Sequence, residues 1–265
     1  MRWLRLLFRA VPAASFPAAV DQRRFWQRFP ISVTFDDEVP EHCEWALPVL
    51  RETGVGATFF LTGLCVDAPR ATWWELLQGA VNADLPLDPL VGPGDVHSRA
   101  ERVKMMQPQE RDGVVRALER MGARASNGAL TRDQLIAIAT EQEVGFHTRR
   151  HDFLPVLPSR DLTRALHEGR ETLEDALGRR LDLIAYPHGG AGRREALAAS
   201  RAGYRLGFTT SQKGWSPGMD PLRIGRIEVR EESPGSLARR LARVLARTPE
   251  AVGGSRIETS RAPSS

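Results

Sequence analysis

A strand–helix–strand pattern near the start of the chain constrains the fold most strongly. Residues 31–36 alternate apolar and polar side chains and lead into acidic residues, as a strand does where it ends in a loop. A helical pattern over residues 39–53 stops at Gly54, and residues 56–63 are typical of a second strand that is buried on both faces. Two strands joined by one helix predict a βαβ unit, in which the strands are parallel.

The same alternation resumes after residue 130. A capping box at Thr131 and Gln134 predicts the start of a helix. Strands are then predicted at residues 143–146, 181–186, 206–210 and 224–229, and helices at residues 160–177, 192–202 and 239–247. We therefore expect an α/β protein with about seven parallel strands, for which a (β/α) barrel is favoured over an open sheet.

The predicted organisation has three parts. Residues 1–30 form a basic N-terminal segment, residues 31–248 a single domain, and residues 249–265 a tail that is expected to be disordered. Inside the domain, residues 67–130 interrupt the alternation with a mostly helical insertion, with predicted helices at 71–80 and 107–121. An excursion of this length between core elements is typical of a lid or a binding loop.

Basic residues gather at the two ends of the chain, whose net charge is +4. Residues 1–30 carry six Arg against one Asp, and residues 223–265 carry nine Arg against five Glu. A nucleic-acid-binding protein is expected to concentrate basic residues on a folded face, so nucleic acid is not predicted as a partner. No apolar stretch reaches the ~18 residues of a membrane span, and Arg5 and Arg9 interrupt the N-terminal apolar run. We expect a cytoplasmic protein with at most a peripheral membrane contact through its N-terminus.

Candidate metal ligands follow two of the predicted strands. Asp36 and Asp37 end the first strand, and because neighbouring side chains point in different directions, one carboxylate can bind a cation while the other acts as a base. His147 and His151 follow the strand at 143–146, and their spacing predicts two imidazoles on one face of a helical turn. One carboxylate and two imidazoles with open positions for water suit a catalytic Zn²⁺ or a similar ion.

A third motif, Ala185-Tyr-Pro-His-Gly-Gly190, follows the strand predicted at 181–186. Its Pro and Gly residues favour a tight turn that brings backbone N–H groups close to the mouth of the site. Taken alone, this motif is more typical of a simple connecting turn.

In their order and placement, these motifs resemble those of the polysaccharide deacetylases, the NodB-homology family of carbohydrate esterases. Thr34-Phe-Asp-Asp-Glu38 is similar to the family's T-F-D-D-G, His147-Thr-Arg-Arg-His151 to H-[ST]-x-x-H, and Ala185-Tyr-Pro-His188 to A-Y-P-[YF]. The resemblance covers residues 31–230 apart from the insertion. It implies a distorted (β/α) barrel and a hydrolase that removes an N-acyl group, acetyl or formyl, from an amino sugar.

The resemblance also implies roles for single residues. One divalent ion, with Zn²⁺ preferred over Co²⁺ or Ni²⁺, would be held by Asp37, His147 and His151, and Asp36 would be the general base. The turn of Tyr186, Pro187 and His188 would contact the substrate, with the backbone N–H of His188 facing the developing oxyanion. Trp215 matches a family position that lines the acyl pocket. Trp73 and Trp74 are candidates for stacking on a sugar ring or for packing within a lid, and Trp74 is the one we assign to substrate binding.

Three positions depart from the family pattern. Glu38 replaces the motif's Gly, which is expected to add a carboxylate beside the metal. Ala185 stands where many members have an Arg that pairs with the base, and we expect Arg226 to supply this cation from a neighbouring strand. Many members use a late histidine as general acid, but no histidine follows His188 here, so His188, a water molecule or another side chain must protonate the leaving amine.

Two other functions compete with deacylation. The same fold could be a catalytically weak or inactive carbohydrate-binding protein, or the acidic run after the first strand could serve a Mg²⁺-dependent phosphohydrolase. A phosphohydrolase has no need of the two histidines, and no glycine loop that cradles phosphate is present. The expected partner is an amino-sugar-containing small molecule or glycan, and a nucleotide-linked or lipid-linked sugar precursor is preferred over a finished polymer.

Overall fold

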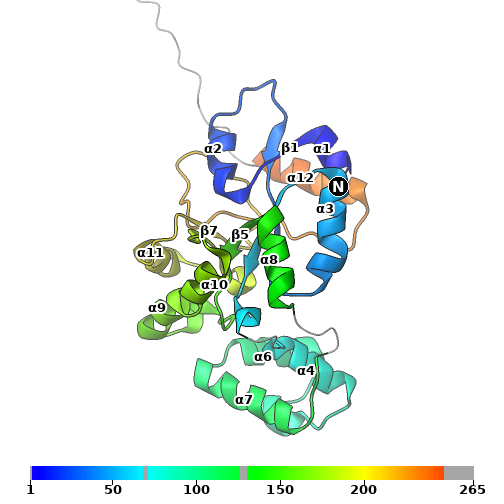
Figure 1. Ribbon diagram of the computed structural model, residues 1–265, viewed down its shortest axis with the longest axis vertical. Helices are drawn as coiled ribbons and strands as arrows, with labels where there is room; N and C mark the ends of the chain where they lie inside the picture. The colour runs from blue at the N-terminus through cyan, green and yellow to red at the C-terminus, as the bar shows by residue number, and fades with distance from the viewer. Residues whose placement is uncertain (1, 68–70, 126–129, 248–265) are drawn as a thin grey trace, which may run out of the picture.

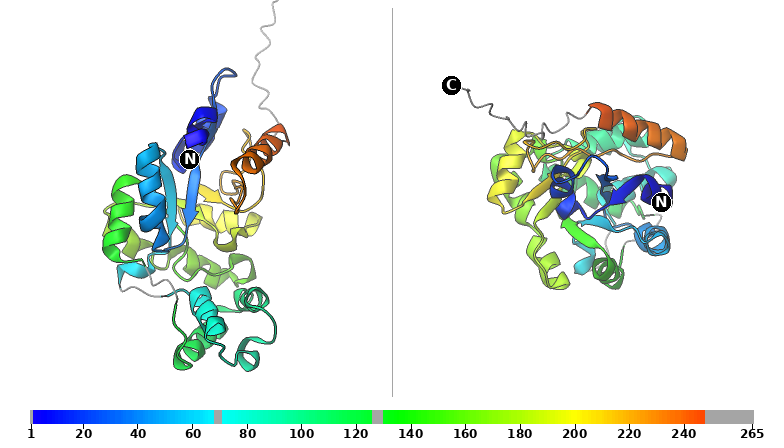
Figure 2. Two further views of the ribbon diagram at one scale, coloured as in Figure 1. Left: turned by 90° about the vertical axis from the view of Figure 1, so that its right-hand side faces the viewer. Right: turned by 90° about the horizontal axis from the view of Figure 1, so that it is seen from above.

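Five parallel strands form the central sheet of the computed structural model, which describes residues 2–67, 71–125 and 130–247 (Figure 1). In chain order these are β3 (Val33–Asp36), β4 (Ala57–Leu61), β5 (Glu143–Phe146), β6 (Leu183–Ala185) and β7 (Leu206–Phe208). Each strand pairs with the next one along the chain, and the sheet curls into a half-barrel (Figure 2). The predicted α/β fold with a distorted parallel barrel is confirmed.

The described residues contain seven parallel strands, as predicted, but only five of them lie in the central sheet. Ile31 belongs to β2 (Phe29–Ile31), which pairs with β1 (Phe8–Ala10) in a separate two-stranded sheet. The segment predicted as a strand at 224–229 contributes a single bridge, between Ile224 and Phe208. Alternating side chains indicate an extended chain, but a strand also needs a neighbouring backbone for its hydrogen bonds, and these segments have one only briefly.

Helices cover the outer face of the sheet. They are α3 (Leu47–Thr53), α8 (Arg132–Glu141), α9 (Ser159–His167), α10 (Arg170–Leu177) and α11 (Arg193–Arg201). Along β4, Phe59 and Leu61 pack into the core beneath these helices, whereas Phe60 packs on the inner face against residues that include Phe208 and Trp215. Strand β4 is therefore buried on both faces, as predicted.

Two of the predicted helices are divided. The helix expected at 160–177 is α9 followed by α10, because Gly169 has φ 79°, a conformation that an α-helix cannot continue. A side chain at Gly169 would also meet Arg149, whose Cδ would lie 2.5 Å from an added Cβ. The helix expected at 39–53 begins as a π-helical stretch, His42–Ala46, before α3.

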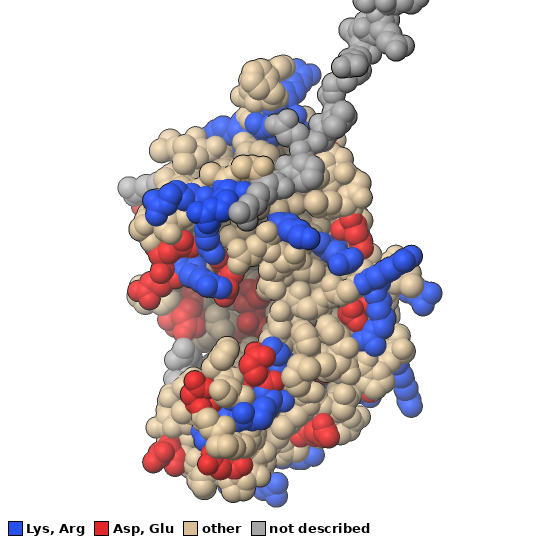
Figure 3. Space-filling model, turned by 180° about the vertical axis from the view of Figure 1, so that it is seen from behind, with Lys and Arg blue, Asp and Glu red and all other residues tan. Residues whose placement is uncertain are grey.

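The insertion forms a helical lobe at the carboxyl ends of the strands (Figure 1). It consists of α4 (Trp73–Asn82), α5 (Asp88–Val91), α6 (Val96–Lys104) and α7 (Pro108–Arg120), of which α5 and α6 were not predicted. The lobe has a hydrophobic core of its own that includes Trp73, Leu77 and Leu118. Seen from behind, a recess containing acidic side chains opens between the barrel and this lobe (Figure 3).

The other end of the sheet carries α1 (Arg2–Leu7), α2 (Phe16–Asp21) and α12 (Pro234–Arg247) (Figures 1 and 2). Among the described helices, none is long and apolar enough to cross a membrane. The tail predicted at 249–265 lies outside the described residues.

Candidate active site

The three motifs meet at the carboxyl edge of the sheet. Asp36 is the last residue of β3, His147 directly follows β5, and Ala185 is the last residue of β6. Parallel strands end at one edge, so side chains just beyond these ends converge. Asp37 and His151 have positive φ angles of 73° and 49°. Non-glycine residues rarely adopt this conformation. Its occurrence at two residues whose side chains lie next to each other in space is typical of a functional site.

Asp37, His147 and His151 form the one group of potential metal ligands found among the described residues. The two Nε2 atoms lie 3.1 Å apart, and Oδ1 of Asp37 lies 3.7 Å from Nε2 of His147 and 3.4 Å from Nε2 of His151. Ligand atoms about 2.0–2.2 Å from a tetrahedral ion are about 3.3–3.5 Å apart, so these separations fit a single small cation.

The chemistry of the three side chains also fits a cation. Oδ1 of Asp37 is buried and has no hydrogen-bond partner among the described residues. Burial, with the nearby charges of Asp36 and Glu38, raises the pKa of Asp37 to about 6, against the opposing effect of His147. Burial lowers the pKa of His151 well below its ordinary value, and His147 and His188 lower it further. Near neutral pH, Asp37 is therefore a carboxylate in an unfavourable buried setting, and His151 is a neutral imidazole. A cation binds these forms of the two side chains.

The backbone of β6 fixes the orientation of His147. Its Nδ1 lies 2.8 Å from the carbonyl oxygen of Ala185, so Nδ1 carries the proton and Nε2 is left to face Asp37 and His151. An imidazole that ligates a metal commonly has such a partner on its other nitrogen. This contact was not predicted, because the sequence of a strand does not reveal which carbonyl a distant ring will reach.

The predicted helical turn at 147–151 is wrong. Thr148 and His151 both have positive φ, and the segment is a loop with a turn at residues 149–150. The two histidines meet because this loop folds back on itself, with the backbone N–H of His151 donating to the carbonyl of Thr148 at 3.2 Å.

Arg226 pairs with Asp36, as expected from the sequence. Its Nη1 and Nη2 donate to the two carboxylate oxygens at 2.6 and 2.7 Å, and Nη1 also contacts Oγ1 of Thr34 at 3.2 Å. Burial alone raises the pKa of Asp36, but the charges of His147 and Arg226 outweigh it and hold this pKa below the ordinary value. Asp36 is therefore held as a carboxylate 3.9 Å from Nε2 of His147.

Glu38 does not add a carboxylate to the ligand group, contrary to prediction. Its two oxygens accept the backbone N–H groups of Gly63 and Cys65 in the loop after β4, the second at 3.0 Å. Where the family motif has a flexible Gly, this chain therefore has a side chain that is fixed by two buried hydrogen bonds.

His188 and Trp74 both lie against His151. The ring centroids of His188 and His151 are 4.5 Å apart, and those of Trp74 and His151 are 4.4 Å apart. The ring centroids of Trp73 and His188 are 6.3 Å apart, and the buried indole N–H of Trp73 has no partner among the described residues. Burial lowers the pKa of His188 to about 4, with Lys104 and His147 acting in the same direction. His188 is therefore a neutral imidazole near neutral pH.

The remaining predicted contact residues, Tyr186, Pro187 and Trp215, have buried side chains. Tyr186 is fully buried and donates its hydroxyl hydrogen to the carbonyl of Leu222 at 2.9 Å, and Pro187 is buried beside it. Trp215 lies in the inner core and donates its indole N–H to Asp21 at 2.9 Å. Substrate contacts at Tyr186 and Pro187 would have to involve the backbone of the turn, and the role of Trp215 stays a prediction.

The helical lobe is tied to the loop that carries His151, a link that was not predicted. Arg111 of α7 forms an ion pair with Asp152, and the two side chains are only 3% and 2% exposed. Arg150 pairs with Asp112 of α7 at 2.6 Å. The residues on either side of His151 thus both contact α7, and the only signal of this in the sequence was that residues of opposite charge, Arg150 and Asp152, flank His151.

Comparisons with known proteins bear on the family and the fold of the chain. The family model described as polysaccharide deacetylase matches residues 27–207. None of the curated protein sequences compared with the chain matches it. Among solved structures, the chain is similar to the Streptococcus pyogenes deacetylase PplD in complex with acetate (17% identity, 90% of this chain and 81% of that chain, TM-score 0.59). It is also similar to IcaB from Ammonifex degensii (20% identity, 91% and 84%, TM-score 0.56) and to the BpsB deacetylase domain from Bordetella bronchiseptica (17% identity, 84% and 80%, TM-score 0.54).

At these identities the solved structures establish the likeness of the fold, whereas the family model covers most of the sheet and all three motifs. From this match over residues 27–207, the chain belongs to the polysaccharide deacetylase family.

Proposed function

We propose that this chain is a metal-dependent hydrolase that removes an N-acyl group, acetyl or formyl, from an amino sugar or a sugar conjugate. The observation that carries the proposal is the position of the Asp36–Arg226 pair directly beside the group formed by Asp37, His147 and His151. A base held ionised next to three metal-ligand side chains is the arrangement that hydrolysis by an activated water requires.

Asp37, His147 and His151 would hold one divalent ion, with Zn²⁺ preferred because two imidazoles and one carboxylate leave open positions around it. When bound, such an ion lowers the pKa of a water molecule and polarises the acyl carbonyl. Asp36 takes the proton from the attacking water, and Arg226 keeps its carboxylate ionised and fixed in orientation. The backbone N–H of His188 is assigned to the oxyanion.

Collapse of the tetrahedral intermediate breaks the C–N bond, and the leaving amine needs one proton. We assign its delivery to the ring of His188, which lies against His151 and, being a neutral imidazole, must first receive the proton that Asp36 took from the attacking water. The alternative donor is Asp36, which holds the proton of the attacking water at this stage. The products in either case are a free amine and a carboxylate.

The helical lobe supports a sugar as the substrate. Trp74 lies beside His151 at the edge of the lobe, where the face of its ring can pack on the C–H face of a sugar. The finer predictions, a nucleotide-linked or lipid-linked precursor and a cytoplasmic location, remain predictions.

A screen for amine release tests the proposal. The chain is stripped with a chelator, reloaded with Zn²⁺, and incubated with N-acetyl and N-formyl amino sugars, free and nucleotide-linked, while primary amine is measured. We expect release by the reloaded protein and none by Asp36→Asn, which keeps the shape of the base but cannot take a proton. If neither acyl series releases amine, the chain is a binding protein of this fold. Release of phosphate from the nucleotide-linked sugars would indicate the phosphohydrolase.

A further inference from the structure

The N-terminal segment closes the end of the sheet that lies away from the site. The backbone N–H of Ala13 donates to Oγ1 of Thr58 at 3.1 Å, and that of Ala14 donates to Oε2 of Glu143 at 3.1 Å. Both acceptors lie at the amino ends of their strands, β4 and β5. One side of the segment is therefore fixed to the barrel, and its other side faces outward at the end opposite the helical lobe (Figure 1).

Large apolar side chains of the N-terminal segment stand exposed. Phe25 and Trp26, in the loop between α2 and β2, are 86% and 69% exposed, and their rings contact each other edge to face with centroids 6.1 Å apart. Leu6 and Leu7 of α1 are also exposed. Such a set of apolar side chains on one short segment is unlike the scattered apolar residues of an ordinary surface.

Arginines surround these apolar residues. The guanidinium of Arg24 lies 5.5 Å from the ring centroid of Trp26, and that of Arg23 lies 5.2 Å from the ring of Phe29. The one acidic residue of the segment, Asp21, accepts the indole N–H of Trp215. The surface is thus positively charged and apolar at once.

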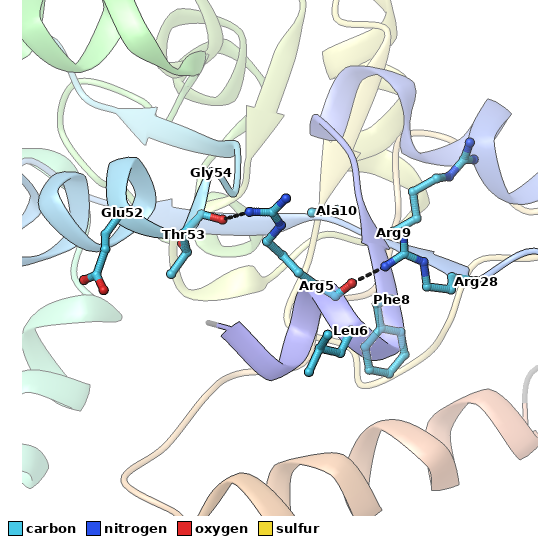
Figure 4. A pocket seen from close by; sticks show the side chains of 9 residues that line it. All are labelled: Arg5, Leu6, Phe8, Arg9, Ala10, Arg28, Glu52, Thr53 and Gly54. Atoms are coloured by element: carbon cyan, nitrogen blue, oxygen red, sulfur yellow. Dashed lines mark hydrogen bonds between the residues drawn. The ribbon is translucent and has the colours of Figure 1, made fainter.

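A hollow of ≈ 630 Å³ lies beside α1, and its lining includes three basic residues, Arg5, Arg9 and Arg28, one acidic residue, Glu52, and the apolar residues Leu6 and Phe8 (Figure 4). Arg28 donates to the backbone carbonyl of Arg5, and Arg5 donates to that of Thr53. Each of these guanidinium groups carries further N–H donors, so the hollow can receive a phosphate group while its apolar wall contacts an acyl chain.

Helix α12 adds a second amphipathic element at the same end of the molecule (Figure 2). Leu237, Leu241 and Leu245 lie along one stripe, and none of the residues of α12 whose side chains are described is buried. Arg239, Arg240 and Arg243 lie on the same helix. Basic amphipathic helices with incompletely buried leucines are typical of proteins that lie on a membrane surface.

We propose that this end of the molecule is a docking surface for an anionic lipid bilayer. Phe25, Trp26, Leu6 and Leu7 enter the headgroup region, and the surrounding arginines contact lipid phosphates. Lipid is preferred over nucleic acid because nucleic acid would leave the leucines without an apolar partner. In this orientation the metal-ligand group, at the opposite end of the strands, faces away from the bilayer. The inference does not depend on the proposed deacylation.

Co-sedimentation with lipid vesicles tests the proposal. The full chain is mixed with large vesicles of phosphatidylcholine alone and of phosphatidylcholine with phosphatidylglycerol, over a range of salt concentrations. We expect binding to the anionic vesicles that weakens as salt rises, and little binding to the neutral ones. Each arginine removed from the surface should weaken binding roughly fivefold.

Two pairs of variants locate the surface. Trp26→Ala should weaken binding at least severalfold, whereas Trp45→Ala, which removes a 70% exposed indole from another part of the fold, should not. Arg23→Gln/Arg24→Gln should weaken binding, whereas Arg116→Gln/Arg120→Gln, which removes the same charge from the exposed face of α7, should not. Thermal unfolding and circular dichroism confirm that each variant is folded.

The proposal is overturned if the wild-type chain does not bind the anionic vesicles, or if both Trp26→Ala and Arg23→Gln/Arg24→Gln bind like it. It is also overturned if Trp26→Ala changes the oligomeric mass in sedimentation but leaves vesicle binding intact, because the surface would then join two copies of the chain.

Discussion

Arg226 holds Asp36 through two hydrogen bonds of 2.6 and 2.7 Å, one to each carboxylate oxygen, although 190 residues separate the two along the chain. Ala185, where many family members have an arginine, is fully buried and offers only its backbone to the site. The guanidinium therefore reaches the same carboxylate from the segment after Ile224. Bidentate pairing fixes the carboxylate in direction as well as in charge.

Replacing Arg226 should move the acidic limb of the pH–rate profile upward. Asp36 acts as a base only when ionised, and Arg226 lowers its pKa, so Arg226→Ala raises that pKa and activity is lost at a higher pH as the pH falls. The measurement is kcat/KM against pH for the wild type, Arg226→Ala and Arg226→Lys. We expect Arg226→Lys to lie between the other two, because it keeps the charge but not the bidentate geometry. An unchanged profile in Arg226→Ala would rule out this role.

The variant His188→Asn separates the role of the His188 ring from that of the His188 backbone N–H. The residue has φ 57°, which Asn tolerates better than most side chains, so the turn should be kept while the imidazole is lost. If the ring protonates the amine, kcat falls on the order of 10²-fold or more, with metal affinity little changed. Single-turnover rates measure the effect. Near-normal rates in His188→Asn would show that Asp36, and not His188, protonates the amine.

The buried pair of Arg111 and Asp152 should contribute much more to stability than an exposed pair. Arg111→Met leaves the buried Asp152 with only the more distant guanidinium of Arg150, 3.9 Å away. Removing one partner of a buried pair typically costs about 3–5 kcal/mol in the free energy of unfolding, and we expect a loss towards the lower end of that range. Arg111→Met/Asp152→Asn should recover part of that loss. Arg51→Met, which breaks the exposed pair with Glu141, is the matched control and should shift the urea midpoint far less. Equal shifts for the two single variants would contradict the account.

Glu38 should matter for folding more than for metal binding. Glu38→Gly leaves the backbone N–H groups of Gly63 and Cys65 without their acceptor, at about 1–3 kcal/mol for each buried group. Glu38→Gln keeps an acceptor oxygen and should lose less. Chemical denaturation and Zn²⁺ titration are run side by side on both variants. A weakened metal affinity with unchanged stability would place Glu38 at the metal after all.

Local features were predictable from the sequence wherever a short pattern determines them. The strand at 143–146 and the capping box at Thr131 are present as predicted, and motifs at strand ends meet because parallel strands share an edge. The features that were missed depend on distant partners. Residues 147–151 have a helical spacing but fold as a loop, held by Ala185 and by α7 through Arg111 and Asp152. The sequence of one segment does not contain such contacts.

Turnover is expected to depend on one divalent ion held by Asp37, His147 and His151. The most direct test is to strip the protein with a chelator and titrate it with Zn²⁺ while amine release is followed on the best substrate of the screen. We predict no turnover without metal and a linear rise that breaks at one equivalent of Zn²⁺, with the break abolished in His151→Ala. Full turnover by the stripped protein, or a titration that is unchanged in His151→Ala, would contradict the account.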